Sequence, residues 1–213
     1  MKNIAFIAPP AAGKGTFSTM LKELGYTHIS TGDLLRNIDS SSEVYETVQR
    51  IFKEGGLVPT EIISTLLKEK LNSFDGPFIL DGYPRSLEQT EALDDILKST
   101  NKTLDKAIYL DVSIDTALKR VLGRLSCPKC KRDYNSLTGF NTPKVEGMCD
   151  DCNVPLEKRS DDNEESFRKR YNTYMSETDP VVNYFDNKGL LVKINAERET
   201  EVVFDEIKKE LDI

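Results

Sequence analysis

The chain has 213 residues, a length that suits one domain with insertions or two small domains. Its 38% hydrophobic and 31% charged residues are ordinary for a soluble globular protein. The 29 lysines and arginines against 36 aspartates and glutamates give a net charge of −7, which argues against a broad basic face for nucleic acid. No apolar run is long enough to span a membrane, and the first three residues lead directly into a predicted strand. We therefore expect a cytoplasmic protein without a membrane partner.

The first predicted element is a buried strand over residues 3–8, which ends at a proline pair. An amphipathic helix opens directly afterwards, at Gly13-Lys14-Gly15-Thr16. At such a junction the backbone N–H groups of the first helical turn point together, and the helix dipole favours negative charge. We therefore expect this loop to bind phosphate, with Lys14 placed to reach it.

The loop departs from the phosphate-loop pattern G-x-x-x-x-G-K-[ST] at two positions. Ala8 stands where the first glycine is expected, and Gly15 takes the place of the hydroxyl residue, with Thr16 directly after it. A solvated glycine–lysine turn is the alternative interpretation. The remainder of the chain favours the phosphate loop.

A small helical excursion is predicted over residues 31–58. Residues 27–30 form a second short strand, and a helix begins directly after it, capped by Thr31 or Asp33. A helical pattern resumes at residues 43–54, and a turn at residues 55–61 leads into a helix that runs through Leu71. His28, the only histidine, is expected to be a strand residue without a chemical role.

Three further strands are predicted, at residues 78–81, 106–112 and 190–194. Strands that alternate with helices predict an α/β fold, with a parallel five-stranded sheet covered on both faces and ligands at the carboxyl ends of its strands. Asp81 ends the third strand beside the phosphate loop, where a carboxylate holds Mg²⁺ directly or through water. A helix cap is the alternative role for Asp81.

Several arginines follow strands or loops of this acidic chain. Arg120 and Arg124 share one face of a helix that begins near Asp115, and Arg170 lies on a helix predicted over residues 163–174. Arginines on helices are usually solvated. The positions of these three arginines, however, suit the binding of a polyphosphate, because a guanidinium group is permanently charged and can bind phosphate through two hydrogen bonds.

All four cysteines lie in one short segment and form two C-x2-C pairs, Cys127 with Cys130 and Cys149 with Cys152. The 18 residues between the pairs fall within the usual spacing of a zinc ribbon. Four thiolates close the coordination shell of zinc, so the metal is expected to be structural. A segment this small has little core of its own, and metal takes the place of core.

Together these motifs resemble the long form of the adenylate kinase family over nearly the whole chain. The resemblance rests on the phosphate loop, the segments at residues 29–36, 56–59 and 78–89, Arg120 to Arg124, the cysteine segment and Arg159 to Asn163. The resemblance implies a P-loop NTPase-like core at residues 1–30, 59–124 and 159–213. It also implies an AMP-binding insertion at residues 31–58 and a zinc-binding lid at residues 125–158.

The activity implied is reversible phosphoryl transfer from ATP to AMP, which yields two ADP and serves adenine nucleotide homeostasis. Mg²⁺ with ATP, structural Zn²⁺ and a monomeric state are implied as well. The implied catalytic residues are Lys14, Arg85, Arg124, Arg159 and Arg170. The implied ATP-binding residues are Ala11, Ala12, Gly13, Lys14, Gly15, Thr16, Arg120, Arg124 and Ala196. The implied AMP-binding residues are Thr31, Arg36, Val58, Gly82, Arg85, Gln89, Arg159 and Arg170.

Three residues depart from the family pattern: Ala8 and Ala11 replace glycines, and Phe17 replaces a glutamine. An alanine forced into a glycine conformation costs about 1 kcal/mol or more, so either the loop shifts slightly or the donor site is weakened. One alternative is therefore a nucleotide sensor that binds ATP and AMP without transfer. Another is a nucleic-acid-binding ribbon beside an ATPase, based on Lys129, Lys131, Arg132 and Lys144 and opposed by the acidic composition.

Overall fold

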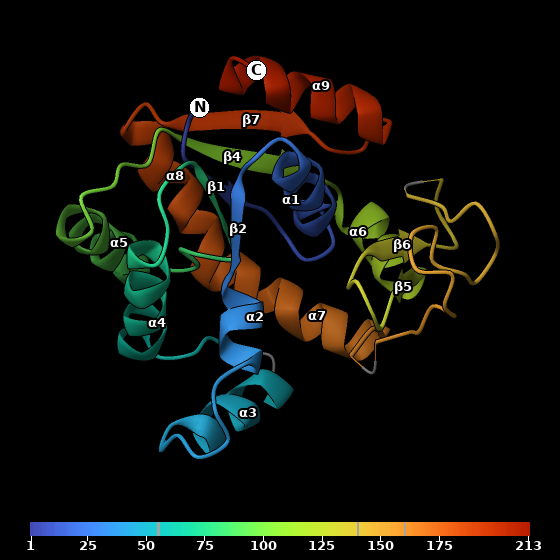
Figure 1. Ribbon diagram of the computed structural model, residues 1–213, viewed down its shortest axis with the longest axis horizontal. Coiled ribbons are helices and arrows are strands. Elements are labelled where there is room, and N and C mark those ends of the chain that lie inside the picture. Colours follow the sequence, from blue (N-terminus) through green and yellow to red (C-terminus); the bar gives the residue numbers. More distant parts are fainter. Residues whose placement is uncertain (55, 140, 160) are drawn as a thin grey trace.

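The structure, a computed structural model, describes residues 1–54, 56–139, 141–159 and 161–213. A central sheet lies between two groups of helices, and a smaller group of strands and loops extends to one side (Figure 1). The five predicted strands form one parallel sheet in the order β2-β3-β1-β4-β7, which confirms the predicted α/β class. The strands are β1 (Ile4–Ile7), β2 (Thr27–Ser30), β3 (Phe78–Asp81), β4 (Lys106–Asp111) and β7 (Leu191–Asn195).

Strand β1 lies at the centre of the sheet, where Ile4 is in register with Ile79 of β3 and with Lys106 of β4. Every residue of β1 is buried, because alternate side chains enter two different cores. Ile4 and Phe6 pack on one face of the sheet, while Ala5 and Ile7 pack on the other. A continuous apolar run is what such a two-sided position requires.

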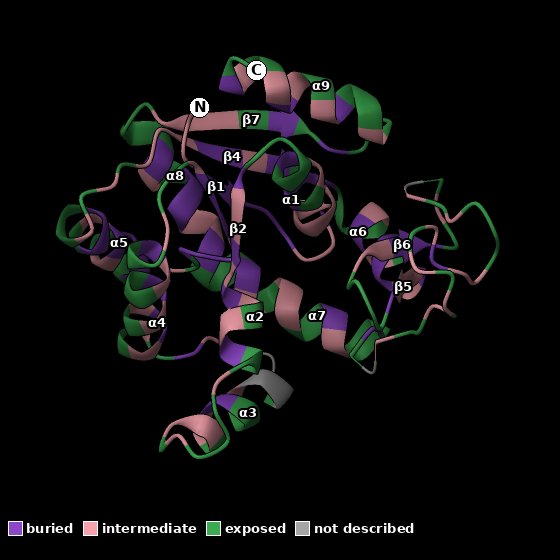
Figure 2. Ribbon diagram, in the orientation of Figure 1, coloured by how far each residue is buried: buried purple, intermediate pink, exposed green. Residues whose placement is uncertain are grey.

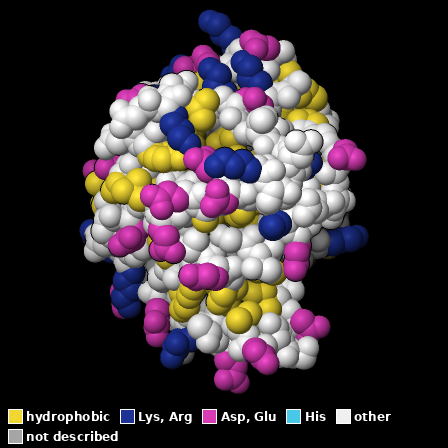
Figure 3. Space-filling model, turned by 90° about the vertical axis from the view of Figure 1, so that its left-hand side faces the viewer, with side chains coloured by type: hydrophobic (Ala, Val, Ile, Leu, Met, Phe, Trp, Pro, Cys, Tyr) yellow, Lys and Arg dark blue, Asp and Glu magenta, His cyan; other side chains and the backbone are white. Residues whose placement is uncertain are grey.

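The helices divide between the two cores, and their buried sides face the sheet (Figure 2). The first core contains residues of α1 (Lys14–Glu23), α6 (Ile114–Leu122), α7 (Glu164–Thr173) and α9 (Thr200–Leu211). The second contains residues of α4 (Thr60–Asn72), α5 (Leu87–Ser99) and α8 (Asp179–Asn187). On the face that carries α4 and α5, acidic and basic side chains are interspersed (Figure 3).

The predicted excursion contains α2 (Thr31–Arg36) and α3 (Tyr45–Glu54), and α3 projects away from the sheet (Figure 1). The prediction that Thr31 or Asp33 caps α2 was wrong. Ser30 caps the helix by accepting a hydrogen bond from the Asp33 backbone N–H, because the strand ends one residue before the first helical turn. The turn predicted at residues 55–61 includes Gly55, which lies outside the described residues.

The cysteine segment forms a separate unit around the antiparallel pair β5 (Arg124–Ser126) and β6 (Asp133–Asn135). Two further bridges, Ser126 with Glu157 and Met148 with Pro155, connect its loops. Its buried cluster contains Cys127, Tyr134 and Cys149, which is a small core for a segment of this length.

A π-helical turn, η1 (Tyr174–Thr178), joins α7 directly to α8. The helix predicted to end near Tyr174 therefore continues to Asn187. The Thr178 hydroxyl donates a hydrogen bond to the Arg85 carbonyl oxygen at 2.8 Å, so the π-turn is tied to the loop after β3. Among the described helices, none combines the length and apolar character that a membrane crossing requires.

Candidate functional site

A cleft of about 740 Å³ opens where the carboxyl ends of the central strands meet the helical excursion and the cysteine segment. It brings together nearly all of the residues predicted for the site. Those that line it are Ala11, Gly13, Lys14, Gly15, Thr16, Thr31, Arg36, Val58, Asp81, Gly82, Arg85, Gln89, Arg120, Arg124, Arg159 and Arg170. Ala12 and Ala196 do not line it; both are buried beside it.

The loop between β1 and α1 has the conformation that its glycine pattern predicts. Gly13 caps α1 in the left-handed region with φ of 107°. Ala11 also has a positive φ, 61°, so the strain expected of an alanine here is present and costs about 1 kcal/mol or more. Ala8 does not have a positive φ and therefore carries no such strain. Phe17 points into the core, where it is fully buried.

Lys14 lies at the start of α1, and its Nζ donates hydrogen bonds to the carbonyl oxygens of Ala8 (3.0 Å) and Pro9 (3.3 Å). Burial lowers the pKa of Lys14 to about 8. The negative charge of Asp81 opposes this shift, whereas Arg85, Arg124 and Arg170 add to it. Because burial disfavours the charged form of Lys14, an anionic ligand beside it would stabilise that form.

Asp81 ends β3 and faces His28 of β2, with 3.1 Å between its Oδ2 and the Nε2 of His28. Burial raises the pKa of Asp81, but the hydrogen bond from His28 and the charge of Lys14 outweigh burial and keep the pKa below its usual value. The carboxylate is therefore ionised near the phosphate loop. An anionic oxygen at this place suits Mg²⁺, which prefers oxygen ligands, so Asp81 fits the predicted metal role.

The loop after β3 is organised around Gly82, whose φ is 85°. Its carbonyl oxygen accepts hydrogen bonds from Thr31 Oγ1 (2.9 Å) and Arg85 Nε (2.7 Å). A Cβ at Gly82 would lie 2.6 Å from Nη2 of Arg85 and 2.8 Å from Oγ1 of Thr31, so only glycine fits. Gln89 Oε1 accepts from the Arg85 backbone N–H at 2.8 Å. This network positions Arg85 in the cleft.

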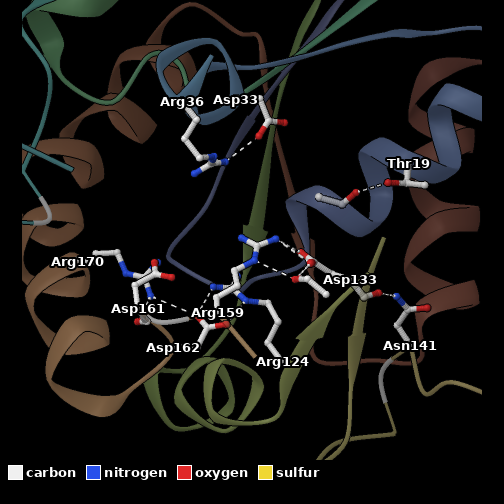
Figure 4. Close-up of polar contacts among 12 residues, drawn as sticks. Thr19, Asp33, Arg36, Arg124, Asp133, Asn141, Arg159, Asp161, Asp162 and Arg170 are labelled. Atoms are coloured by element: carbon white, nitrogen blue, oxygen red, sulfur yellow. Dashed lines mark hydrogen bonds and ion pairs between the residues drawn. The ribbon is translucent and has the colours of Figure 1, made fainter. Parts of the chain in front are cut away.

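Arg85 lies in the cleft among other cations. Burial lowers its pKa, Asp81 opposes that shift, and the positive charges of Arg170 and Arg36 add to it. Arg36 approaches from α2, where it forms an exposed ion pair of 2.8 Å with Asp33 (Figure 4). Two arginines from different elements thus face one end of the cleft, which is an arrangement suited to a phosphate.

Three arginines at the other side of the cleft are each paired with an aspartate (Figure 4). Arg124 binds Asp162, with 2.7 Å from its Nε to Oδ2. Arg159 binds Asp133, and Arg170 binds Asp161 at 3.0 Å. Burial lowers the pKa of Arg124, but its hydrogen bonds to Asp162 outweigh burial and raise the pKa above its usual value.

Arg120 is nearly fully buried at the end of α6. Its guanidinium donates to the carbonyl oxygens of Ala12 (3.3 Å) and Ala196 (2.8 Å). It therefore ties the phosphate loop to the segment after β7. The contact between Arg120 and adenine that the resemblance implies stays a prediction.

The four cysteines come together as the spacing predicts. Their Sγ atoms all lie within 4.8 Å of one another, and no disulfide joins them. Four thiolates at this separation fit a tetrahedral zinc ion with bonds of about 2.3 Å. Cys127 and Cys149 are buried, whereas Cys130 is exposed and Cys152 is half-buried.

Two residues to which the sequence analysis assigned no part in the site also line the cleft, His28 and Asp133. Each acts through a partner distant in the chain, Asp81 for His28 and Arg159 for Asp133. No local pattern indicates such pairs. Side chains alternate between the two faces of β2, and this alternation turns His28 toward Asp81 of β3. The contact can be recognised only once it is known that β2 and β3 are neighbours in the sheet.

Comparison with known proteins gives a consistent result. Residues 6–190 match the model of the adenylate kinase family. A protein from Thermotoga petrophila named adenylate kinase is 41% identical over 214 residues, which cover 98% of this chain and 96% of the relative. Relatives of the same name from Thermosipho melanesiensis and Desulforamulus reducens are 43% and 40% identical, each covering 96% of this chain and 97% of the relative.

The parallel sheet, the phosphate loop and the arginines around the cleft agree with this similarity. So does the position of the match, which includes the loop, both segments that border the cleft and all four cysteines. The chain belongs to the adenylate kinase family.

Proposed function

We propose that the chain catalyses reversible transfer of the γ-phosphoryl group of ATP to AMP, yielding two ADP. The observation that supports this most strongly is the convergence of Lys14 and four arginines, Arg85, Arg124, Arg159 and Arg170, on one cleft. Transfer to an anionic phosphate needs no strong general base, so positioning and charge stabilisation carry the reaction. The nucleotide-sensor alternative has no specific observation in its favour.

In this proposal the donor and acceptor lie end to end in the cleft. The loop N–H groups and Lys14 hold the donor phosphates, and Arg120 lies against the donor base. Arg36 and Arg85 hold the phosphate of AMP, while Thr31, Val58 and Gln89 border its base. Arg124, Arg159 and Arg170 surround the moving phosphoryl group and neutralise its charge.

Adenylate kinases use Mg²⁺ with ATP, and in this chain Asp81 would hold the ion directly or through water. The ion supplies further charge neutralisation at the donor phosphates. The four cysteines would hold structural Zn²⁺ in the lid. No other cofactor is proposed.

Water competes with AMP as acceptor, so the cleft must close before transfer. We propose that residues 31–58 close over AMP and residues 125–158 close over ATP, with residues 1–30, 59–124 and 159–213 as the core. Zinc would keep the lid rigid as it moves. Since one chain contributes every proposed site residue, we propose that the protein acts as a monomer. The proposed location is the cytoplasm, where adenine nucleotides are abundant.

The direct test is product formation. With Mg²⁺, ATP and AMP the protein is expected to consume both nucleotides equally and form ADP. With CMP, UMP or GMP in place of AMP, formation of diphosphate is expected to be slower, because Thr31 and Gln89 border the base. Binding of ATP and AMP without any ADP would support the sensor instead.

Affinity for ATP is expected to fall as pH rises through 8. The Lys14 pKa of about 8 means that its charge is largely present at pH 7 and largely lost at pH 9, and a polyphosphate binds the charged form. We expect Kd to rise about tenfold between these pH values, measured by calorimetry without Mg²⁺. Lys14→Arg, whose guanidinium stays charged, should give a flat profile; an equal decline in that variant would contradict the assignment.

A further inference from the structure

Asp133 is a carboxylate of β6 in the cysteine segment that faces the phosphate loop across the cleft. Its Oδ1 and Oδ2 accept hydrogen bonds from Nη2 of Arg159 at 2.7 and 2.9 Å. Ser126 completes the group: its hydroxyl donates to Asp133 and accepts from Nε of Arg159 at 2.9 Å. The carboxylate thus binds Arg159 on the edge with which a guanidinium otherwise binds phosphate.

The same carboxylate lies close to the start of α1. A Cβ built at Gly15 would lie 3.9 Å from Oδ2 of Asp133 (Figure 4 shows Asp133 between Arg159 and this helix). Gly15 belongs to the first turn of α1, whose exposed N–H groups and dipole favour an anion. Asp133 also acts on Arg124. Burial lowers the pKa of Arg124, Asp162 raises it, and the charge of Asp133 raises it to a smaller extent.

Asp133 therefore occupies the guanidinium of Arg159, which a donor phosphate would use, and lies beside the first turn of the phosphate-loop helix, where that phosphate would bind. We infer that Asp133 competes with the donor phosphates for Arg159 and thereby limits the affinity of the protein for ATP. The inference rests on the proposed function in that ATP is taken as the donor.

The contact is weak enough to be displaced. The side chains of Arg159 and Asp133 are 36% and 25% exposed, so water screens part of their attraction. A triphosphate carries more charge than one carboxylate and reaches the loop N–H groups as well, so it wins the competition. Removal of the competing charge should tighten binding of ATP about two- to fivefold.

The test compares Asp133→Asn with wild type and with Glu146→Gln. The amide keeps the size of Asp133 and one acceptor oxygen, and it removes the charge. Glu146 is an exposed acid of the same segment, so its substitution changes net charge equally away from the cleft. Calorimetry measures Kd for three probes without Mg²⁺: ATP, inorganic tripolyphosphate and adenosine. Melting temperatures verify that the variants are folded, and Asp133→Ser serves as a second neutral variant.

Asp133→Asn and Asp133→Ser are expected to bind ATP and tripolyphosphate about two- to fivefold more tightly than wild type. Binding of adenosine should be unchanged, and Glu146→Gln should match wild type for every probe. Unchanged or weaker binding of both phosphate probes in the two Asp133 variants would overturn the inference, since the carboxylate would then position Arg159 rather than compete for it. An equal gain in Glu146→Gln would overturn it too, by assigning the effect to net charge.

These outcomes are separate from those that test phosphoryl transfer. Kd is measured without AMP or Mg²⁺, so no turnover is required. If ADP formation fails in every variant while the Asp133 substitutions still tighten binding of ATP and tripolyphosphate, the proposed transferase activity is wrong and the role of Asp133 stands.

Discussion

Lys14→Met is expected to lower the rate of ADP formation by about three orders of magnitude while the protein stays folded. The side chain donates to the carbonyl oxygens of Ala8 and Pro9 at the start of α1, next to the predicted phosphate position. Methionine keeps most of the unbranched chain and removes the charged amino group. Loss of one pre-organised group that stabilises transition-state charge typically costs about 10²–10³ in turnover, and Lys14 carries a full charge. The rate of ADP formation at saturating ATP and AMP measures this loss.

Lys98→Met is the matched control for this substitution. Lys98 is exposed on α5, and its ion pair with Asp95, at 3.6 Å, is exposed as well. Turnover and melting temperature should both stay close to those of wild type, since exposed pairs contribute little. Wild-type turnover in Lys14→Met would show that the loop does not hold the donor phosphates.

The double substitution Cys127→Ser and Cys130→Ser is expected to abolish zinc binding and to lower the melting temperature by on the order of 10 °C. Among the described residues of the cysteine segment, the buried cluster consists of Cys127, Tyr134 and Cys149, so metal coordination is expected to supply much of the segment's stability. A loss of a few kcal/mol in a chain of this size shifts the melting temperature by about that amount. Zinc analysis and thermal unfolding provide the two readouts.

Removal of zinc from the wild-type protein with a chelator should reproduce the loss of stability, and the double variant should be insensitive to the chelator. Affinity for AMP is expected to change little, because Thr31, Arg85 and Gln89 belong to other elements. A wild-type protein that holds no zinc and is equally stable with and without chelator would refute a structural metal site.

Much of the fold was predictable because it depends on local signals. The continuous apolar run of β1 indicates a strand buried on both faces, and the structure confirms it. The two C-x2-C pairs require only that their hairpins face each other, and the four Sγ atoms do come together. Nearly all of the nucleotide-binding residues implied by the family pattern line the cleft.

Details that depend on packing were harder to predict. Thr31 and Asp33 are acceptable caps by residue type, but the strand ends at Ser30 and leaves that hydroxyl at the cap position. Ala8 and Ala11 both replace glycines, yet only Ala11 has a positive φ, so only one of the two substitutions strains the loop. The conformation at each position, which residue type does not reveal, makes the difference.

Contacts between distant segments were not predictable from the sequence. His28 was expected to have no role beyond its strand, but parallel pairing of β2 with β3 sets it against Asp81. Asp133 appears in sequence as one acid among many. Only the fold of the cysteine segment brings it to Arg159 and to the first turn of α1.

In the proposed function the loop and the arginines form one closed chamber, in which a phosphoryl group passes between two nucleotides. The most direct measurement follows the label when γ-labelled ATP, AMP and Mg²⁺ are mixed with the protein. Label is expected in the β-phosphate of ADP, with release of inorganic phosphate slower by orders of magnitude. Label that appears in inorganic phosphate while AMP stays unchanged would contradict the proposed function.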